Sequence, residues 1–352
     1  MHRAAIVGTG AIAAAHAQAL SDHRDRITLT SVVDVDGARA RTFADTWHAP
    51  GVAPNLTALL AGGGLDLVHL CTPPSTHAPL ALECLRAGVN VLLEKPPTLS
   101  LAEIDQLAAA SAETGAQVAT VFQHRFGSGA VRLREMIAKG ELGRSLLATC
   151  NTLWYRDAAY FEVPWRGKWE TEGGGPTMGH GIHQFDLLLS ILGPWEQVTA
   201  VAGRRSRKVD TEDVSMALVT FADGTLASVV NSVVSPRQTS ALRFDFERAT
   251  VELEHLYGYR DADWTVTPAP GETVHWEASS TVTSGHGGQL TAVLDALDGG
   301  GVLPVGIEET RQTMEFVAAL YASAFTGAPV RAGEIGPGSP FAERMDGEGT
   351  PW

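Results

Sequence analysis

The chain has 352 residues, 44% of them hydrophobic and 19% charged, which is the composition of an ordinary globular protein long enough for two domains. With 40 acidic and 26 basic residues the net charge is −14, and this negative field disfavours nucleic acid and anionic membrane surfaces as partners. No apolar run approaches the roughly 20 residues of a membrane span, and the first strand is expected so early, at residues 4–7, that no signal peptide is expected before it. The three cysteines, Cys71, Cys84 and Cys150, lack metal-ligand spacing and favour reduced thiols in a cytoplasmic protein.

The first 20 residues have the order of a dinucleotide-binding unit. The strand at residues 4–7 precedes a glycine turn at residues 8–13, and an alanine-rich helix follows. Gly8 permits the tight turn, Gly10 leaves room for a pyrophosphate, and the helix N-terminus offers free N–H groups to the phosphates. We therefore expect the cofactor to contact Gly8, Gly10, Ala11 and Ile12.

Asp34 follows the second predicted strand, residues 29–33, at the distance expected of the acid that binds the adenosine ribose. A carboxylate there accepts from a 2′-hydroxyl and repels a 2′-phosphate, so NAD is favoured over NADP. Arg39 and Arg41 on the next helix keep NADP open, and a helix N-cap is the alternative role for Asp34.

Two more strand–helix units complete this half. A strand at residues 66–70 leads through a proline loop into a helix ending near residue 87, and a strand at 88–93 precedes a helix at 101–114 and a strand at 117–122. Alternating strands and helices predict a doubly wound parallel α/β sheet of the Rossmann type. Lys95 then lies at the carboxyl edge of the sheet, where ligands bind, although a surface Glu-Lys turn is the alternative for this segment.

The second half, residues 123–330, is expected to be an α+β domain with a large, open-faced, mostly antiparallel sheet. Its alternating strands are predicted at residues 197–203, 214–221, 225–233, 241–248 and 250–256, with Asp223-Gly224 as a hairpin turn. Helices near residues 288–297 and 307–326 are expected to cover one face of this sheet, leaving the other for subunit pairing. Residues 331–352 are rich in glycine, proline and acids and are expected to form a mobile tail.

A glycine-rich segment, residues 173–181, opens a helix that carries three polar side chains three residues apart. The glycines suggest that something approaches this backbone closely. His180, His183 and Asp186 share a helix face, and imidazole titrates near neutral pH, which suits proton transfer. Hydrogen-bonded core histidines are the alternative, and a metal site is disfavoured because no further ligand stands at the required spacing.

Aromatic and basic residues surround this segment in the sequence. Aromatic rings can pack on the C–H face of a sugar, and arginine beside them can bind hydroxyls, so Tyr155, Trp165 and Arg166 are candidate substrate contacts. Ordinary core or dimer packing is the alternative for Trp154, Trp165, Trp169 and Trp195.

Together these motifs resemble the glucose–fructose oxidoreductase/inositol dehydrogenase (Gfo/Idh/MocA) family over residues 4–330. The resemblance is carried by the turn at 8–13, Cys71-Thr72-Pro73-Pro74 with His77, Glu94-Lys95-Pro96, Gln123-His124-Arg125-Phe126, and the glycine-rich segment ending in His183. It implies a Rossmann domain (1–122), a substrate domain with an open-faced sheet, dimers or tetramers through that sheet, and NAD(P)-dependent oxidation or reduction of a sugar, glycoside or cyclitol. Thr72, Pro73, His77, Glu94, Lys95 and Gln123 are then expected at the cofactor, and Arg125 and His180 at the substrate.

The resemblance also implies two catalytic residues. Lys95 would hydrogen-bond the reacting oxygen, and His183 would exchange the hydroxyl proton. Gly179 stands where many members have an aspartate, so that role is missing or has passed to His180. Two alternatives remain open: a redox-neutral glycosidase that oxidises its substrate transiently with a tightly held NAD, and a non-catalytic sensor of nucleotide and sugar.

Overall fold

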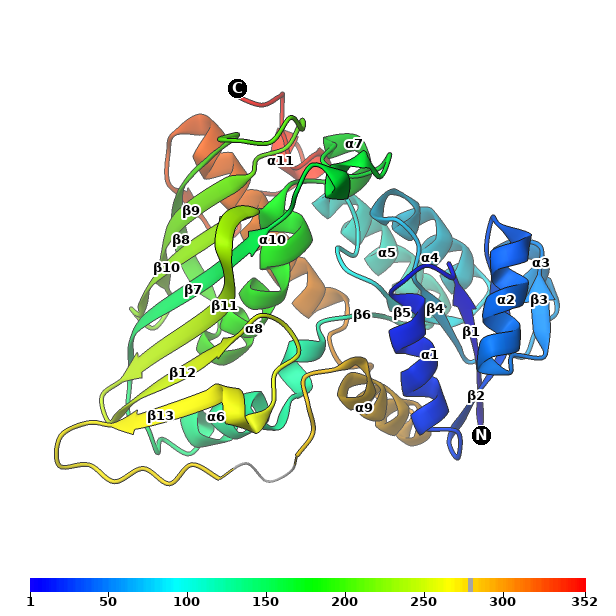
Figure 1. Ribbon diagram of the computed structural model, residues 1–352, viewed down its shortest axis with the longest axis horizontal. Helices are drawn as coiled ribbons and strands as arrows, with labels where there is room; N and C mark the ends of the chain where they lie inside the picture. The colour runs from blue at the N-terminus through cyan, green and yellow to red at the C-terminus, as the bar shows by residue number, and fades with distance from the viewer. Residues whose placement is uncertain (278–280) are drawn as a thin grey trace. The chain divides into compact units, whose positions relative to one another are not determined.

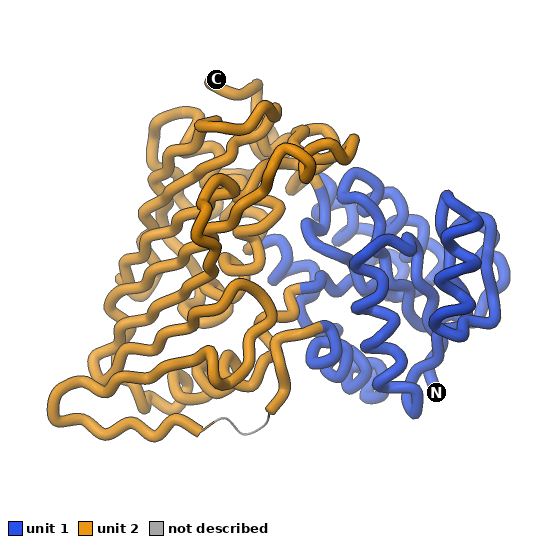
Figure 2. Tube along the Cα trace, in the orientation of Figure 1, with its two compact units in different colours: residues 1–98, 102–121, 286–311 blue, residues 99–101, 122–285, 312–352 orange. Residues whose placement is uncertain are grey.

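The computed structural model describes residues 1–277 and 281–352, and the chain divides into two compact units (Figure 2). Unit 1 comprises residues 1–98, 102–121 and 286–311, and unit 2 comprises residues 99–101, 122–285 and 312–352. The predicted boundary at 122/123 falls one residue from where the chain leaves unit 1, and residues 286–311 then return to that unit.

Unit 1 is a six-stranded parallel sheet in the order β3-β2-β1-β4-β5-β6 (Figure 1), which confirms the predicted Rossmann fold. Its strands are β1 (His2–Val7), β2 (Ile27–Val33), β3 (Gly51–Ala53), β4 (Leu67–Leu70), β5 (Asn90–Leu93) and β6 (Val118–Thr120). Its helices are α1 (Ala13–Asp22), α2 (Gly37–Trp47), α3 (Leu56–Ala61), α4 (His77–Arg86), α5 (Leu101–Thr114) and α9 (His286–Gly299), with a 3₁₀ turn η1 (Pro74–Thr76) before α4.

Strand β1 shows why this sheet is covered on both faces. Ala4 and Ile6 belong to an apolar cluster that also contains residues of α1 and α9, whereas Ala5 and Val7 belong to a second cluster with residues of α4 and α5. All four are buried, because successive side chains of a strand point to opposite faces.

Helix α9 was expected to cover the sheet of the second domain, and that prediction is wrong. Leu290, Val293 and Leu294 are fully buried in the cluster that contains Ala13, Ala17 and Leu20 of α1. The amphipathic pattern predicted the helix but does not say which sheet it packs on.

Unit 2 is an eight-stranded sheet in the order β13-β12-β11-β7-β10-β9-β8-β14. Its strands are β7 (Ser145–Tyr155), β8 (Trp195–Gly203), β9 (Val214–Phe221), β10 (Leu226–Ser232), β11 (Val234–Phe246), β12 (Ala249–His255), β13 (Trp264–Pro268) and β14 (Val330–Arg331). Neighbours are antiparallel except β10 and β7, which confirms the mostly antiparallel prediction. The β9–β10 hairpin turns at Gly224, where φ is +88°.

The helices of unit 2 include two that cover one face of this sheet, α8 and α10 (Figure 1). The helical segments are η2 (Gln123–Phe126), α6 (Ser128–Ala138), η3 (Ala159–Glu162), α7 (Trp169–Glu172), the π-helical turn η4 (Thr177–Gly181), α8 (Ile182–Leu192), η5 (Asp261–Asp263), α10 (Ile307–Thr326) and α11 (Pro340–Glu343). Phe316 of α10 packs edge-on against Phe185 of α8 and Trp195 of β8, with ring centroids 5.3 and 5.7 Å apart. The expectation that the helix at 307–326 covers this sheet is therefore confirmed.

The last 22 residues were expected to be a mobile tail, but they pack on unit 2. Ile335 and Met345 are buried, β14 pairs with β8, and the Trp352 ring lies 5.2 Å from that of Phe325. Isolated apolar residues in a glycine- and proline-rich segment carry no periodicity, so no pattern in this segment predicted its packing. Among the described residues, no helix is long and apolar enough to cross a membrane.

Candidate active site

The predicted site residues fall into two groups, one in each unit. Gly8, Gly10, Ala11, Ile12, Asp34, Thr72, Pro73, His77, Glu94 and Lys95 belong to unit 1. Gln123, Arg125, Tyr155, Trp165, Arg166, His180 and His183 belong to unit 2.

The glycine turn of unit 1 fits a dinucleotide. At Gly8, φ is +88°, and a Cβ there would lie 2.7 Å from the carbonyl oxygen of Cys71, so only glycine is accommodated. A Cβ at Gly10 would meet nothing within 4 Å, which leaves open space beside the turn and the start of α1. Because Gly8, Cys71 and Glu94 directly follow the neighbouring strands β1, β4 and β5, the turn and both following loops lie at the same sheet edge.

Asp34 ends β2 and holds the turn in place. Its carboxylate accepts hydrogen bonds from the Thr9 N–H and hydroxyl, both at 2.7 Å, and from Arg39 Nη2 at 2.6 Å. Burial alone would raise the pKa of Asp34, but Arg39 and the N–H groups of Asp36 and Thr9 outweigh it and lower the pKa to about 2. The alternative N-cap role is wrong, because Asp36 caps α2. Arg39 was one reason to keep NADP as an alternative cofactor, and its side chain forms an ion pair with the Asp34 carboxylate.

The loop after β4 contains Thr72, Pro73 and His77. The two ring nitrogens of His77 lie 2.8 Å from the carbonyl oxygens of Pro96 and Thr72, and the side chain is buried. His77 therefore joins the loops after β4 and β5, and its expected contact with the cofactor stays a prediction. The Thr72 hydroxyl accepts from Thr76 at 2.7 Å.

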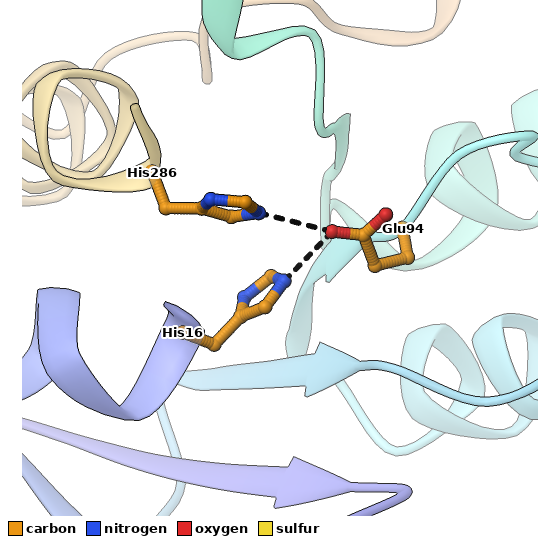
Figure 3. Close-up of side chains that lie close together, drawn as sticks. All are labelled: His16, Glu94 and His286. Carbon is orange, nitrogen blue, oxygen red and sulfur yellow. Dashed lines mark hydrogen bonds and ion pairs between the residues drawn. The ribbon is translucent and has the colours of Figure 1, made fainter. Parts of the chain in front are cut away.

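Glu94 and Lys95 directly follow β5. Glu94 Oε1 accepts hydrogen bonds from Nε2 of His16 at 3.0 Å and from Nε2 of His286 at 3.1 Å (Figure 3), and its Oε2 accepts from the Lys95 backbone N–H. Glu94 is buried and fixes the backbone of the half-buried Lys95, while its expected contact with the cofactor stays a prediction. Sequence reasoning missed His16 and His286, because His286 is 192 residues from Glu94 and no local pattern joins them.

The protonation of this cluster follows from its burial. Burial would raise the pKa of Glu94, but the two histidine hydrogen bonds outweigh it and hold the pKa well below its usual range. Burial lowers the pKa of His16 and that of His69, whose Nδ1 lies 2.9 Å from Nδ1 of His16. A neutral His16 therefore donates from Nε2 to Glu94 and accepts at Nδ1 from His69. His16, Glu94 and His286 each have an atom that could coordinate a metal ion, and these three atoms lie within 4.8 Å of one another. Both histidine nitrogens point at the same carboxylate oxygen, however, which is the geometry of N–H donors in hydrogen bonds.

In unit 2, the turn η4 and helix α8 send their three predicted side chains to different partners. His180 meets Trp154 edge-on at 5.0 Å between ring centroids, and its Nε2 lies 3.3 Å from Arg156 Nε. His183 stacks on His124 at 5.1 Å between ring centroids. Trp154 also lies edge-on to Tyr257, which meets His183, so His180 of the π-helical turn and His183 of α8 border one aromatic cluster.

Asp186, the third of these side chains, is paired with Arg125. Arg125 Nε and Nη2 each donate to the carboxylate at 2.6 Å, and Thr313 adds a hydroxyl at 3.2 Å. This poorly exposed bidentate pair joins η2 to α8, and the expected contact of Arg125 with the substrate stays a prediction.

The surroundings of His183 include two residues that sequence reasoning missed, His124 and Tyr257. The Tyr257 ring lies edge-on to His183 at 5.4 Å, and its hydroxyl accepts from Gln123 Nε2 at 2.5 Å. Gln123 Oε1 is buried and accepts no hydrogen bond from the residues that the structure describes, so it stays a candidate for the cofactor. The motif at 123–126 pointed to this region, but nothing local marks Tyr257.

A second aromatic group lies beside His180. Tyr160 and Trp165 flank the Arg166 guanidinium, whose Cζ is 3.8 and 4.5 Å from the two ring centroids. Arg156 lies over Trp154 and Tyr160, at 4.7 and 5.1 Å. The predicted substrate contacts Trp165 and Arg166 thus belong to one cluster with Trp154, Tyr160 and Arg156. The third predicted contact, Tyr155, precedes Arg156 in the chain and is 40% exposed.

The close approach expected at the glycine-rich segment is confirmed. A Cβ at Gly174 would collide with the Tyr321 hydroxyl, one at Gly175 with the backbone oxygen of Glu212, and one at Gly181 with Asn231. The protein's own residues make the close approach to this backbone. Gly179 differs, since its Cβ would lie 3.6 Å from a Glu172 oxygen, which is ordinary contact.

Gly175→Ala is therefore expected to lower the free energy of unfolding by about 3 kcal/mol, because the new methyl meets a backbone atom that cannot turn away. Gly179→Ala is the matched control and is expected to stay within about 1 kcal/mol of wild type, on the stable side. Urea unfolding measures both. Equal losses in the two variants would contradict this explanation of the glycine-rich segment.

Glu212 accepts hydrogen bonds from the backbone of the glycine-rich segment, and its carboxyl group titrates near neutral pH. Its carboxyl accepts from the N–H groups of Gly175 and Thr177 and from the Tyr321 hydroxyl, at 3.0, 3.1 and 2.9 Å. Burial raises its pKa from 4.5 to about 7, against the pull of these hydrogen bonds.

The folded state therefore keeps a proton on Glu212 between pH 4.5 and 7 that the unfolded chain has lost, so this group's contribution to stability falls as pH rises through that window. Relative to Glu212→Gln, which does not titrate, wild type is expected to lose about 3 kcal/mol of unfolding free energy from pH 4.5 to pH 7.5. Urea unfolding of both proteins at the two values measures the difference. A difference that stays constant with pH would refute the raised pKa.

Comparisons with known proteins agree with this architecture. Residues 2–122 match the model of the oxidoreductase family with an NAD-binding Rossmann fold, and residues 130–252 match the GFO/IDH/MocA C-terminal domain. D-glucoside 3-dehydrogenase of Escherichia coli is 26% identical over 93% of this chain and 97% of its own. Inositol 2-dehydrogenase 2 of Paenarthrobacter aurescens is 28% identical over 84% of this chain and 91% of its own.

Solved structures agree as well. The WlbA dehydrogenase of Chromobacterium violaceum, in complex with NADH and UDP-GlcNAcA, superposes with a TM-score of 0.82 at 27% identity, covering 95% of this chain and 97% of that one. Levoglucosan dehydrogenase with NADH and levoglucosan has the same fold, with a TM-score of 0.82 at 17% identity over 95% and 100% of the two chains. Both family models together span most of units 1 and 2, and the glycine turn and Asp34 supply the features that NAD binding requires. The chain belongs to the Gfo/Idh/MocA family of oxidoreductases, with unit 1 as its NAD-binding Rossmann domain.

Proposed function

We propose that this protein is an NAD-dependent dehydrogenase that oxidises or reduces a carbinol carbon of a sugar, glycoside or cyclitol. The observation that carries the proposal is the position of Lys95, an amine directly after β5 and beside the strand ends that bear the NAD-binding turn. The aromatic and basic groups of unit 2 support a sugar-like substrate, as do relatives whose names specify glucoside and inositol.

The residues that would hold NAD are those of the sheet edge in unit 1. Gly8 and Gly10 would admit the pyrophosphate at the start of α1, Asp34 would accept from the adenosine ribose, and Thr72 and Pro73 would line the loop after β4. When bound, NAD supplies the acceptor for the hydride that leaves the substrate carbon.

Two side chains of the chain itself would act at the substrate oxygen. In oxidation, the imidazole of His183 would take the hydroxyl proton, while the Lys95 Nζ donates a hydrogen bond to that oxygen and stabilises its negative charge. In reduction, His183 would return the proton and Lys95 would polarise the carbonyl. Positioning of the substrate against both groups lowers the entropic barrier.

The test is NADH formation by the purified enzyme with NAD and a panel of methyl glycosides, free sugars and inositols. Reduction of NAD by at least one class, with NADP much poorer, is the expected result. Release of the chromophore from a nitrophenyl glycoside with no net NADH would instead favour the redox-neutral glycosidase. No reduction of NAD by any member, in either assay, would count against the dehydrogenase.

We further propose that this is a cytoplasmic protein that self-associates through the open face of the unit 2 sheet. Cys71, Cys84 and Cys150 are free and buried, as suits a reducing compartment. Leu147, Val201, Met216, Leu218 and Leu226 expose 44 to 68% of their surface on neighbouring positions of β7 to β10.

Leu218→Lys is expected to convert the dimer or tetramer into a monomer, because it places a charge in the middle of that apolar face. Light scattering after size-exclusion chromatography measures the mass. Val302→Lys, at an exposed residue of unit 1, is the control and should leave the mass unchanged. A wild-type protein that is monomeric at micromolar concentration would contradict the proposal.

A further inference from the structure

Arg156 and Arg166 of unit 2 lie around one tyrosine ring. Their Cζ atoms are 5.1 and 3.8 Å from the centroid of Tyr160, and each guanidinium also lies over a tryptophan, Trp154 or Trp165. Two like charges are thus held in a partly buried aromatic setting, which costs free energy unless an anion compensates.

Among the residues that the structure describes, no carboxylate lies within ion-pair distance of either guanidinium. Arg156 donates from Nε to Nε2 of His180 at 3.3 Å and from Nη1 to the Tyr155 carbonyl at 3.0 Å, and neither acceptor is a carboxylate. Arg166 Nε is buried and donates to no described residue. By contrast, the poorly exposed Arg125 and Arg132 of the same unit do have carboxylate partners, at 2.6 and 3.1 Å.

The nearest acids are committed elsewhere. Asp157 Oδ1 accepts from the Tyr160 backbone N–H at 3.0 Å, and Glu172 Oε2 accepts from that of Gly167 at 2.6 Å. Burial lowers the pKa of both guanidiniums, and in Arg166 the charge of Arg156 lowers the pKa further, against the opposing effect of Glu172. An arginine stays charged at neutral pH, and Asp157 and Glu172, which attract Arg156 and Arg166 from beyond ion-pair distance, compensate this double positive charge only in part.

We propose that Arg156 and Arg166 form a binding site for an anionic group on the sugar, the carboxylate of a sugar acid or the phosphate of a sugar phosphate. The sugar part of this inference rests on the dehydrogenase function proposed above. Guanidiniums bind both anions through two parallel N–H donors, and the rings of Trp154, Tyr160 and Trp165 offer apolar faces to the C–H side of the same ligand. The protein therefore discriminates acidic from neutral sugars.

The test is calorimetric binding to the NADH-bound protein, with ligands paired by charge. Glucuronate and galacturonate are compared with their neutral amides, and glucose 6-phosphate with glucose. At least one anionic ligand is expected to bind ten times or more tighter than its neutral partner, with the preference falling at high salt. The uronate and phosphate arms identify which anion is preferred.

Arg156→Gln and Arg166→Gln are each expected to lower this preference about threefold, and the double variant is expected to abolish it. Arg237→Gln, at an exposed side chain of the same unit, is the matched control and should leave the preference unchanged. Unaltered NADH affinity and circular dichroism establish that each variant is folded. Because the readout is the ratio between paired ligands, a general loss of affinity does not imitate the result.

Equal affinity for every charged and neutral pair, or a preference that survives in the double variant, would overturn the anion site. Turnover of neutral sugars together with equal affinities would reject the anion site and leave the dehydrogenase intact. Tight binding of an acid through these arginines without any turnover would reject the dehydrogenase and leave the anion site intact.

Discussion

Replacement of Lys95 by methionine is expected to lower kcat/KM by a factor of 10² to 10³, the range found when one hydrogen-bond donor to a developing oxyanion is removed. Methionine keeps the unbranched shape of the side chain and deletes only the ammonium group, so the loop after β5 should keep its fold. The loss is expected mainly in kcat, because the oxygen becomes more negative in the transition state than in the bound substrate. Initial rates of NADH formation with the best substrate of the panel measure both constants.

Lys139→Met is the matched control, since Lys139 is an exposed lysine at the end of α6. It should retain wild-type rates. A Lys95→Met enzyme within threefold of wild type, with NAD affinity unchanged, would remove Lys95 from the chemistry.

The second large effect is expected at His183. His183→Ala should lower kcat for oxidation by 10² to 10⁴, because proton removal by a placed base is lost. The pH profile is the sharper readout: wild-type kcat should fall on the acid side as the imidazole protonates, and this limb should disappear in the variant. His255→Ala, at a half-exposed ring on β12, is the control and should keep both the rate and the limb.

If both groups act on one oxygen, the double variant should be less impaired than the product of the single losses. Once either group is missing, the other stabilises a poorer transition state. Strictly multiplicative losses would indicate that Lys95 and His183 act independently.

Local signals in the sequence predicted much of this fold. Helix α5 has the predicted bounds, Leu101–Thr114, because it ends before Gly115 with φ at +77°, a position that side chains disfavour. Strand β9 also has its predicted bounds, Val214–Phe221, because β-branched and apolar residues fill the segment and the turn at Gly224 follows. The NAD-binding turn was predictable because its chemistry lies in a few consecutive residues.

The supporting contacts of the candidate site could not be predicted, because they join distant segments. Glu94 is held by His16 and His286, and His183 lies beside His124 and Tyr257. No spacing rule connects such residues, since their proximity depends on how helices and loops pack after the sheet has formed.

The contacts of the glycine-rich segment and of Arg125 also could not be predicted from the sequence. The glycines indicated a close approach, but only the packed structure shows that Tyr321, Glu212 and Asn231 make it. Arg125 stood in a motif associated with the site, and its pairing with Asp186 is a contact across 61 residues.

The account depends on Lys95 of the NAD-binding unit and His183 of the sheet unit acting on the same substrate oxygen. A crystal structure of the enzyme with NADH and a bound sugar tests this most directly. It should place Lys95 Nζ and a ring nitrogen of His183 each within about 3.2 Å of one hydroxyl oxygen. A sugar whose hydroxyl beside the nicotinamide contacts neither group, or only other side chains, would contradict it.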